Sequence, residues 1–272
     1  MPSDQIKYKR WGVTLTLAGL ALVAAISVLV AFQDQLGIQS ALLQTLQTNF
    51  YNDFIKADRY LLLVNGLLVT LQITVFSVIA GTFIGLFLAL VKVLEGNGKY
   101  IFFLTRFTNI YLTVIRGTPV VVQLMIIYYG IFASVNIDKI FVAILAFSIN
   151  SGAYVAEIIR AGILAVDRGQ MEAGRTLGLP YATTMKKIIL PQAFKNILPA
   201  LFNELITLLK ETSVAAFIAV ADLTRSGDMI RAKTYDPFLP LFAVAVIYLV
   251  LVVGLTQLVG RLERRLRRSD NR

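Results

Sequence analysis

The stretch from residue 60 to residue 91 reads YLLLVNGLLVTLQITVFSVIAGTFIGLFLALV, 32 consecutive positions without a charged side chain. The hydrocarbon core of a bilayer is about 30 Å thick, so a helix needs about 20 apolar residues to cross it. The stretch therefore predicts a membrane-spanning helix. Because it exceeds one straight crossing, we expect it to tilt or to protrude from the hydrocarbon.

Two further stretches are free of charge for long enough to span a bilayer, residues 11–32 and residues 238–260. Of the 272 residues, 57% are hydrophobic, whereas soluble domains average about 45–50%. Residues 11–32 are long for the apolar part of a signal peptide, and no clear small-residue cleavage site follows them. We expect this stretch to be retained as a helix. Composition therefore predicts an all-α integral membrane protein.

Several kinds of chemistry are excluded by what the chain lacks. It has no Cys and no His, which rules out disulfides, thiolate or imidazole metal sites and His-based acid–base catalysis. The glycine-containing stretch at residues 95–99 lacks the spacing of a phosphate-binding loop and is expected to be a turn. The sequence shows no recognisable combination of a nucleophile with an acid–base pair. The residues thus predict no catalytic site, no metal site and no nucleotide site in this chain.

The net charge of +10 is explained by where the basic residues lie. Nineteen of the 26 Lys and Arg residues fall in four clusters, at residues 7–10, 92–116, 160–195 and 261–272. These clusters follow alternate spans, as the positive-inside rule requires of cytoplasmic segments. The positive charge is therefore a topology signal with a role at the lipid surface, and it does not predict nucleic-acid binding.

This distribution predicts six spans with both termini in the cytoplasm. The spans are expected at about residues 11–32, 60–91, 107–134, 140–160, 197–220 and 238–260. The expected organisation is a cytoplasmic N-terminus with an additional span in residues 1–32, an external connection in 33–59, a transmembrane domain in 60–260 and a basic cytoplasmic tail in 261–272. The transmembrane domain includes a long cytoplasmic loop at about residues 160–195.

Polar side chains within the expected spans are the candidate functional residues. Such residues cost several kcal/mol in lipid, so they usually face a cavity or a partner. Three groups are candidates for a substrate pathway or gate: Arg116, Thr118, Pro119 and Gln123; Asn150, Tyr154 and Glu157; and Lys210, Glu211, Thr212 and Ser213.

Local geometry supports each group. Pro119 should kink its helix because it lacks an N–H and its ring clashes with the preceding turn. Asn150, Tyr154 and Glu157 lie at i, i+4 and i+7, on one helix face. A break near Lys210 would expose backbone groups and paired charges along a pathway.

Each group also has a purely structural interpretation, which the residues leave open. Arg116 could reach the inner headgroups beside a tolerated kink. Asn150 and its neighbours could form hydrogen bonds between helices, or Glu157 could pair with Arg160 one turn away. Lys210 and Glu211 could form a self-satisfied ion pair.

The cytoplasmic loop is too long for a simple turn. We expect a short helix beginning near Gly169, with Glu172 favoured by the dipole at its start. Gly178 and Pro180 should then force a sharp turn, followed by a second helix that Pro191 ends. Such a pair could be a rigid knob that inserts into another protein, or an amphipathic hairpin that lies on the inner leaflet.

The spacing of this loop, EAG-x3-G-x9-I-x-LP from Glu172 to Pro191, resembles the EAA loop of permease subunits of ABC importers. The match has no gaps. It departs at Gly174, where the usual pattern has alanine, and we expect glycine to loosen the helix by about 0.5–1 kcal/mol. The resemblance implies that Glu172, Ala173, Gly174, Gly178, Leu179 and Pro191 couple the chain to an ATPase.

Flanking motifs narrow the resemblance to the histidine/glutamine/arginine-type polar amino acid permeases. It extends over about residues 65–263 and rests on RGTPVVVQL at 116–124, GAYVAEIIRAG at 152–162, GQMEA at 169–173 and KETS at 210–213. The family implies a type I ABC importer core of five transmembrane helices, to which residues 11–32 add one N-terminal helix.

The resemblance also implies partners in a plasma membrane of a bacterium. These are a second permease subunit, identical or related, two ABC ATPase subunits that bind ATP and Mg, an external substrate-binding protein, membrane lipid and a polar amino acid as substrate. The chain itself is then a transport subunit without a cofactor and not an enzyme.

Two other classes are weaker alternatives. One is a self-sufficient ion-driven secondary transporter or channel, with Glu157, Lys210 and Glu211 as an ion relay. The other is a membrane scaffold without transport. The EAA spacing argues against the first, and the second would show no effect of substrate.

Overall fold

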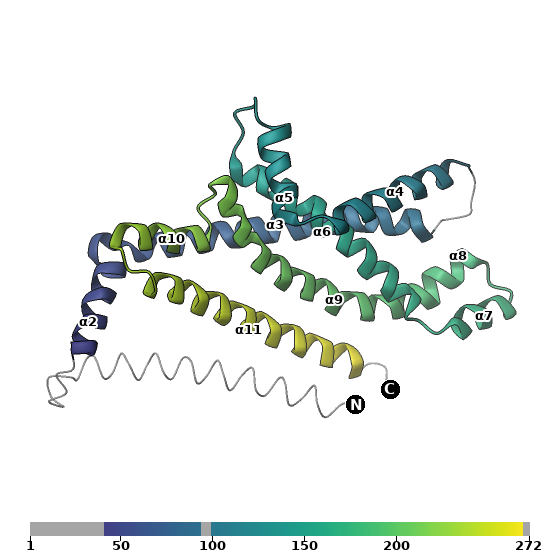
Figure 1. Cartoon of the computed structure of the whole chain (residues 1–272). Coiled ribbons are helices and arrows are strands. Elements are labelled where there is room, and N and C mark those ends of the chain that lie inside the picture. The colour runs from purple at the N-terminus through teal and green to yellow at the C-terminus, as the bar shows by residue number, and fades with distance from the viewer. Residues whose placement is uncertain (1–40, 94–98, 269–272) are drawn as a thin grey trace. The chain divides into compact units, whose positions relative to one another are not determined.

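The computed structural model describes residues 41–93 and 99–268, and every regular element in that part of the chain is helical (Figure 1). The α-helices and the shorter π- and 3₁₀-helices, labelled η, follow one another in this order: α2 (Ala41–Phe50), η1 (Tyr51–Ile55), η2 (Lys56–Asp58), α3 (Tyr60–Val93), α4 (Lys99–Gly117), α5 (Val120–Met125), η3 (Ile126–Ile131), α6 (Lys139–Leu164), α7 (Arg168–Thr176), α8 (Tyr181–Thr184), η4 (Met185–Ile189), α9 (Leu190–Glu211), η5 (Thr212–Ile218), α10 (Leu223–Thr234) and α11 (Leu239–Arg268).

Among the described residues, three helices are long and apolar enough to cross a membrane: Tyr60–Val93, Lys139–Leu164 and Leu239–Arg265. A fourth candidate span is the pair Tyr100–Gly117 and Val120–Ile131, which is bent by 106° at the break between them. The described residues therefore form an all-helical membrane fold with three or four candidate spans. The additional span expected at residues 11–32 lies outside the described residues.

Two of the expected spans have different boundaries in the structure. The span expected at 107–134 begins earlier, with α4, and is divided by the bend at Pro119. The span expected at 197–220 is part of a longer segment in which α9 starts at Leu190 and continues after Glu211 as the 3₁₀-helix η5. The α-helix thus gives way to a 3₁₀-helix within Lys210–Ser213, where a break was one interpretation of the sequence.

The chain divides into two compact units. One comprises the described residues up to Leu68 together with Ala221–Gln257. Its core consists of Phe54, Leu63, Leu223, Ile230 and Val244. Close packing within this unit depends on glycine, because a Cβ at Gly66 would lie 2.3 Å from the Ser226 Oγ.

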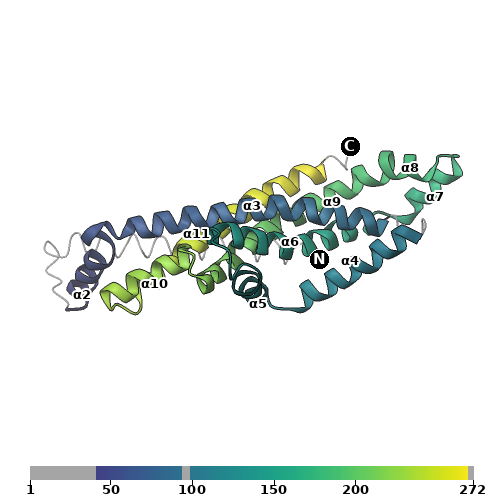
Figure 2. The same ribbon diagram turned by 90° about the horizontal axis from the view of Figure 1, so that it is seen from above.

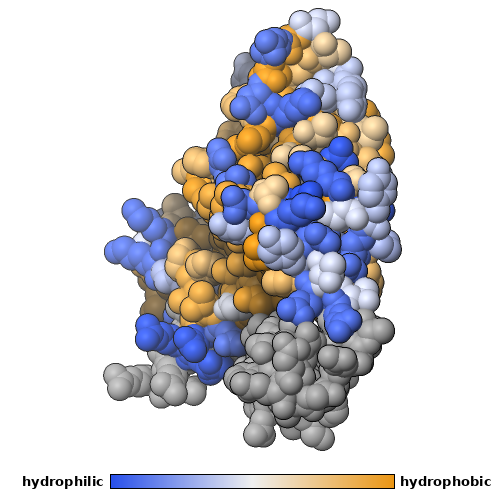
Figure 3. All heavy atoms as spheres, turned by 90° about the vertical axis from the view of Figure 1, so that its left-hand side faces the viewer, coloured by the Kyte–Doolittle hydropathy of each residue, from blue (hydrophilic) through white to orange (hydrophobic). Residues whose placement is uncertain are grey.

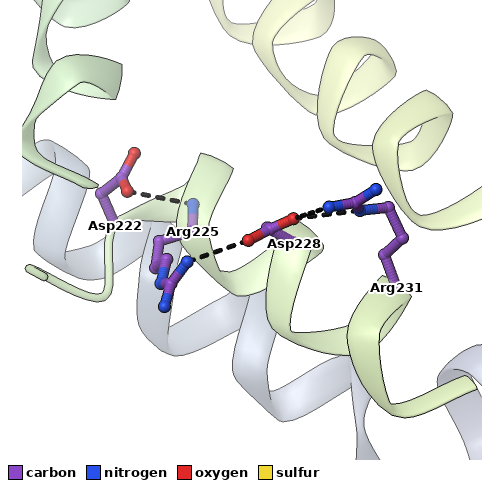
Figure 4. Close-up of polar contacts among 4 residues, drawn as sticks. All are labelled: Asp222, Arg225, Asp228 and Arg231. Atoms are coloured by element: carbon purple, nitrogen blue, oxygen red, sulfur yellow. Dashed lines mark hydrogen bonds and ion pairs between the residues drawn. The ribbon is translucent and has the colours of Figure 1, made fainter. Parts of the chain in front are cut away.

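Helix α10 in this unit has a buried cap and an exposed ion-pair row (Figure 4). The Asp222 carboxylate accepts hydrogen bonds from the amides of Thr224 and Arg225, both at 3.0 Å, as expected of an N-cap. Burial raises the pKa of Asp222, although these amide bonds oppose the change. One turn on, Asp228 pairs with Arg225 at 2.9 Å and with Arg231 at 2.6 Å.

The second unit comprises Val69–Val220 together with the described residues from Leu258 onward. Helix α6 is its centre, with Phe147 fully buried among Val142, Ala146 and Leu208. Within this unit, α3 approaches α6 through small residues, since a Cβ at Gly81 would lie 3.0 Å from the Ser151 Cβ. Small residues at such crossings let membrane helices pack closely.

Candidate functional site

The first candidate site is the loop that contains α7, which lies with α8 beyond the ends of α6 and α9 in both ribbon views (Figures 1 and 2). Asp167 caps α7 by accepting a hydrogen bond from the Gly169 amide at 2.6 Å. The helix ends at Thr176, and Gly178 follows with a φ of +78°. The predicted short helix and sharp turn are thus confirmed, because a left-handed residue here is what commonly closes a helix.

Gly174 lies on the buried side of α7, against Thr184. A Cβ at Gly174 would come within 2.5 Å of the Thr184 Cγ2 and 2.9 Å of its Oγ1. Real Cβ contacts are not that short, so the alanine of the EAA pattern would overlap Thr184 if it replaced Gly174 here. Glycine at this position permits close packing, in addition to any loosening of the helix.

The opposite edge of α7 is open. Glu172 and Ala173 are exposed, and Leu177 just after the helix is 79% exposed. Leu179 is half-buried, and Met171 packs on a core that includes Ile159 of α6 and Ile197 of α9. The helix is therefore anchored to the ends of α6 and α9 on one side and presents its other side for contact.

Leu177 was not among the predicted site residues. The signal that could have found it is an apolar side chain at the end of a polar helix, directly before the glycine that closes the turn. An exposed large apolar side chain of this kind is typical of a contact surface.

The prediction that Pro191 ends the second helix is wrong. The chain runs from α8 through the π-helix η4 into α9, and Pro191 lies in the first turn of α9. The Leu190 amide donates to the Met185 carbonyl, five residues back. This wider turn is the kind of local adjustment by which a helix tolerates a proline that lacks an N–H.

The second candidate site is the bend between α4 and α5. Here Gln123 replaces hydrogen bonds that the bend removes: its Nε2 donates to the Ile115 carbonyl at 2.7 Å and to the Thr118 carbonyl at 3.0 Å. The Gln123 Oε1 in turn accepts a hydrogen bond from the Asn150 Nδ2 at 3.0 Å. Gln123 and Asn150 are 8% and 3% exposed. The bend is thus tied to α6 by a buried amide pair.

Arg116, Tyr154 and Glu157 meet on one side of this bend. The Arg116 guanidinium lies 3.8 Å from a Glu157 carboxylate oxygen and 5.8 Å from the centre of the Tyr154 ring. Glu157 also accepts two hydrogen bonds from Arg160, one of them from Nε at 3.1 Å. The helix face predicted for Asn150, Tyr154 and Glu157 therefore divides into a buried residue and two residues that contact Arg116.

An open cavity of about 550 Å³ lies beside these charges. It is lined by Lys92, Asn109, Leu112, Thr113, Arg116, Gly117, Glu157 and Arg160. Three cationic side chains thus surround one carboxylate. Of these lining residues, only Arg116 and Glu157 were predicted site residues. Asn109 and Thr113 could have been found, because Asn109, Thr113 and Arg116 follow the same i, i+4, i+7 spacing on α4 that identified the polar face of α6.

The third group lies where α9 passes into η5. Lys210 is exposed, Glu211 and Ser213 are half-buried, and the buried Thr212 donates its hydroxyl to the Leu209 carbonyl at 2.8 Å. The structure adds a further residue, because the Ser151 hydroxyl of α6 lies 3.0 Å from the Glu204 carboxylate of α9. Glu204 could have been found from the sequence, because it is a charged residue within a largely apolar stretch.

Comparison with known proteins places the chain in a family. Residues 81–268 match the model of the binding-protein-dependent transport system inner membrane component. The chain is 44% identical over 210 residues to the arginine transport system permease protein ArtQ of Bacillus subtilis, a match that covers 76% of this chain and 94% of that protein. It is 38% identical over 209 residues to the glutamine transport system permease protein GlnP of Escherichia coli, covering 76% and 93% respectively.

Solved structures agree. A crystal structure described as an amino acid ABC transporter with histidines has a TM-score of 0.72 and 44% identity, covering 78% of this chain and 98% of that one. An inward-facing structure of the MetNI methionine ABC transporter, at 23% identity, shares the fold with a TM-score of 0.63, covering 76% and 97%. The chain therefore belongs to the family of binding-protein-dependent transport system inner membrane components, as a non-catalytic, multi-pass permease subunit of an amino acid ABC importer in a bacterial inner membrane.

Proposed function

We propose that this permease crosses the membrane six times, with both termini in the cytoplasm and residues 33–59 outside. It pairs with a second permease subunit, identical or related. Two separate ATPase subunits bind ATP and Mg and contact the loop at about residues 160–195, and an external binding protein delivers the substrate. The alternation of basic and acidic segments along the chain supports this orientation.

In this proposal α7 is the lever between ATPase and membrane. The single observation that carries the proposal is the division of this helix into an anchored side and an open side. Met171 holds it against the core at the ends of α6 and α9, and Gly174 packs against Thr184 of α8, while Glu172, Ala173 and Leu177 are exposed on the side that would contact a partner. Closure of the ATPases then moves α7 together with the ends of two long helices, as a rigid element.

The substrate pathway is proposed to run past the cavity at Arg116. An amino acid zwitterion needs donors for its carboxylate and an acceptor for its ammonium. Arg116, Lys92 and Arg160 supply cationic donors, and Glu157 supplies the acceptor. The junction of Lys210, Glu211, Thr212 and Ser213 is proposed as a second polar segment of the pathway or its gate.

The substrate is proposed to be a polar amino acid of the kind that the relatives are named for. Those names specify arginine and glutamine for two of the permeases, and the crystal structure described above concerns histidines. Fixed recognition of the shared α-carboxylate and α-ammonium groups is compatible with such a range of side chains.

Reconstitution with the ATPase and the binding protein tests the lever. Glu172→Ala and Leu177→Ala change the open side of α7 and should reduce substrate uptake at least tenfold, because the ATPase no longer drives the permease. The control Asn136→Ala alters an exposed residue between η3 and α6 and should transport normally. Full uptake by both α7 variants, at equal amounts of assembled complex, would contradict the proposal.

A further inference from the structure

A buried carboxyl group lies in the segment between α2 and α3, outside the part of the chain that the family model matches. Asp53 in η1 is only 1% exposed. Its neighbour Phe54 belongs to the core formed with Leu223, Ile230 and Val244, and η1 is packed on α10. All these residues lie within one compact unit. The face that carries α2 and α10 presents hydrophilic side chains among apolar ones (Figure 3).

Neither carboxyl oxygen of Asp53 receives a hydrogen bond from the described residues. The groups that act on it are Thr234 at the end of α10, Asp236 in the turn before α11, and Arg59. The Thr234 hydroxyl donates its proton to the Ile230 carbonyl at 3.0 Å, and the Arg59 guanidinium donates to the Asn52 carbonyl. An ionised carboxylate in such a place is costly, so Asp53 needs a positive charge or a proton of its own.

The neighbouring carboxyl group, that of Asp236, has backbone hydrogen-bond donors that Asp53 lacks. Asp236 Oδ1 accepts hydrogen bonds from the amides of Phe238 at 2.8 Å and Leu239 at 3.1 Å. Although burial acts against it, these amides hold the pKa of Asp236 below its ordinary value. Burial is the largest effect and raises the pKa of Asp53; the neighbouring Thr234 hydroxyl lowers it, the charge of Asp236 raises it again, and Arg59 lowers it least. Two neighbouring carboxyl groups with such different surroundings separate into one proton donor and one ionised acceptor.

We propose that Asp53 and Asp236 form a proton-operated latch, in which the protonated Asp53 carboxyl group donates a hydrogen bond to the Asp236 carboxylate and fastens η1 to the turn between α10 and α11. Loss of the proton leaves two carboxylates facing each other and releases η1. Under the proposed topology both segments are external, so the latch responds to external pH; this last point rests on the proposed function.

The direction of the pH effect follows from the shift on Asp53. Its folded-state pKa lies above the ordinary value of 3.8, so packing of η1 takes up a proton. The latch is closed at low pH and opens as the pH rises through that raised pKa. At low pH the latch holds until Asp236 itself becomes protonated and no longer accepts the hydrogen bond. Because the pKa of Asp236 is lowered, this happens only below pH 3.8.

Spin-label mobility measures the latch without requiring transport. The chain has no native cysteine, so a single label can be placed by Tyr51→Cys, at a side chain that is 56% exposed. In the full-length permease complex in detergent, we expect the label to become mobile in a titration with a midpoint above pH 3.8. Asp53→Asn keeps a donor that cannot ionise, so its label should stay immobile at every pH. The matched control Asp58→Asn, at an exposed carboxyl group of η2, should titrate as the parent does.

One further variant keeps the test valid if Asp53→Asn does not fold. Asp236→Asn removes the facing charge, and its midpoint should shift to lower pH even if Asp53→Asn fails to fold. A parent label that is insensitive to pH, an Asp53→Asn label that titrates as the parent does, or mobility that depends on added Na⁺ or Ca²⁺ in place of pH, would overturn the latch. If the parent complex shows the expected pH titration of the label but does not take up an amino acid, that result counts against the proposed function alone and not against the latch.

Discussion

The Asn150 amide of α6 donates to the Gln123 side chain of α5 at 3.0 Å, and the same glutamine donates to two carbonyls at the bend after α4. One side chain thus completes the backbone hydrogen bonding of a 106° bend and links it to the helix that lines the charged cavity. These side-chain hydrogen bonds hold the bend in one conformation.

Gln123→Leu tests this bracing. Leucine fills a similar volume but strands the Asn150 amide and the carbonyls of Ile115 and Thr118, so the free energy of unfolding should fall by about 1–3 kcal/mol. Denaturant titration of the purified permease measures the change. Gln192→Leu is the matched control, because Gln192 is exposed on α9 and its replacement should alter stability by less than about 0.5 kcal/mol. Equal stability of the two variants would show that Gln123 has no bracing role.

Gly174→Ala separates two opposite expectations. Helix propensity alone predicts that alanine stabilises α7 by about 0.5–1 kcal/mol. The contact with Thr184, at 2.5 Å from an added Cβ, predicts overpacking that destabilises by about 1–3 kcal/mol. We expect the contact to dominate, so that the unfolding free energy decreases.

The double variant Gly174→Ala/Thr184→Ala provides the control. Removing the Thr184 Cγ2 and Oγ1 relieves the overlap, so the two changes should be coupled by about 0.5–3 kcal/mol in a double-mutant cycle. If the two substitutions act additively, or if Gly174→Ala alone stabilises the protein, then the contact with Thr184 does not explain the glycine.

Much of the fold follows from local sequence. The span at α3 and the bend at Pro119 are predictable, because lipid demands long apolar helices and proline removes a backbone donor wherever it occurs. The short helix α7 and its end at Gly178 follow from equally local rules.

What escaped prediction depends on contacts between distant residues. The role of Gln123 is set by carbonyls that only the bend exposes, and that of Gly174 by Thr184, ten positions away. The prediction that Pro191 ends a helix failed because the residues before it form a wider π-helical turn, which lets the helix continue past the proline. Lys92 belongs to the cavity only because α3 ends beside α4 and α6 within the same unit.

Glu157→Gln tests the proposed contact with substrate. The glutamine keeps the size of the side chain but removes the charge that pairs with Arg116 and Arg160. If Glu157 also accepts the substrate ammonium, the substrate concentration for half-maximal ATPase stimulation should rise about tenfold, which corresponds to about 1.4 kcal/mol. Asp58→Asn, which neutralises an exposed carboxylate outside the cavity, should leave that concentration unchanged. An unaltered value for Glu157→Gln, with normal maximal stimulation, would restrict Glu157 to holding the two arginines in place.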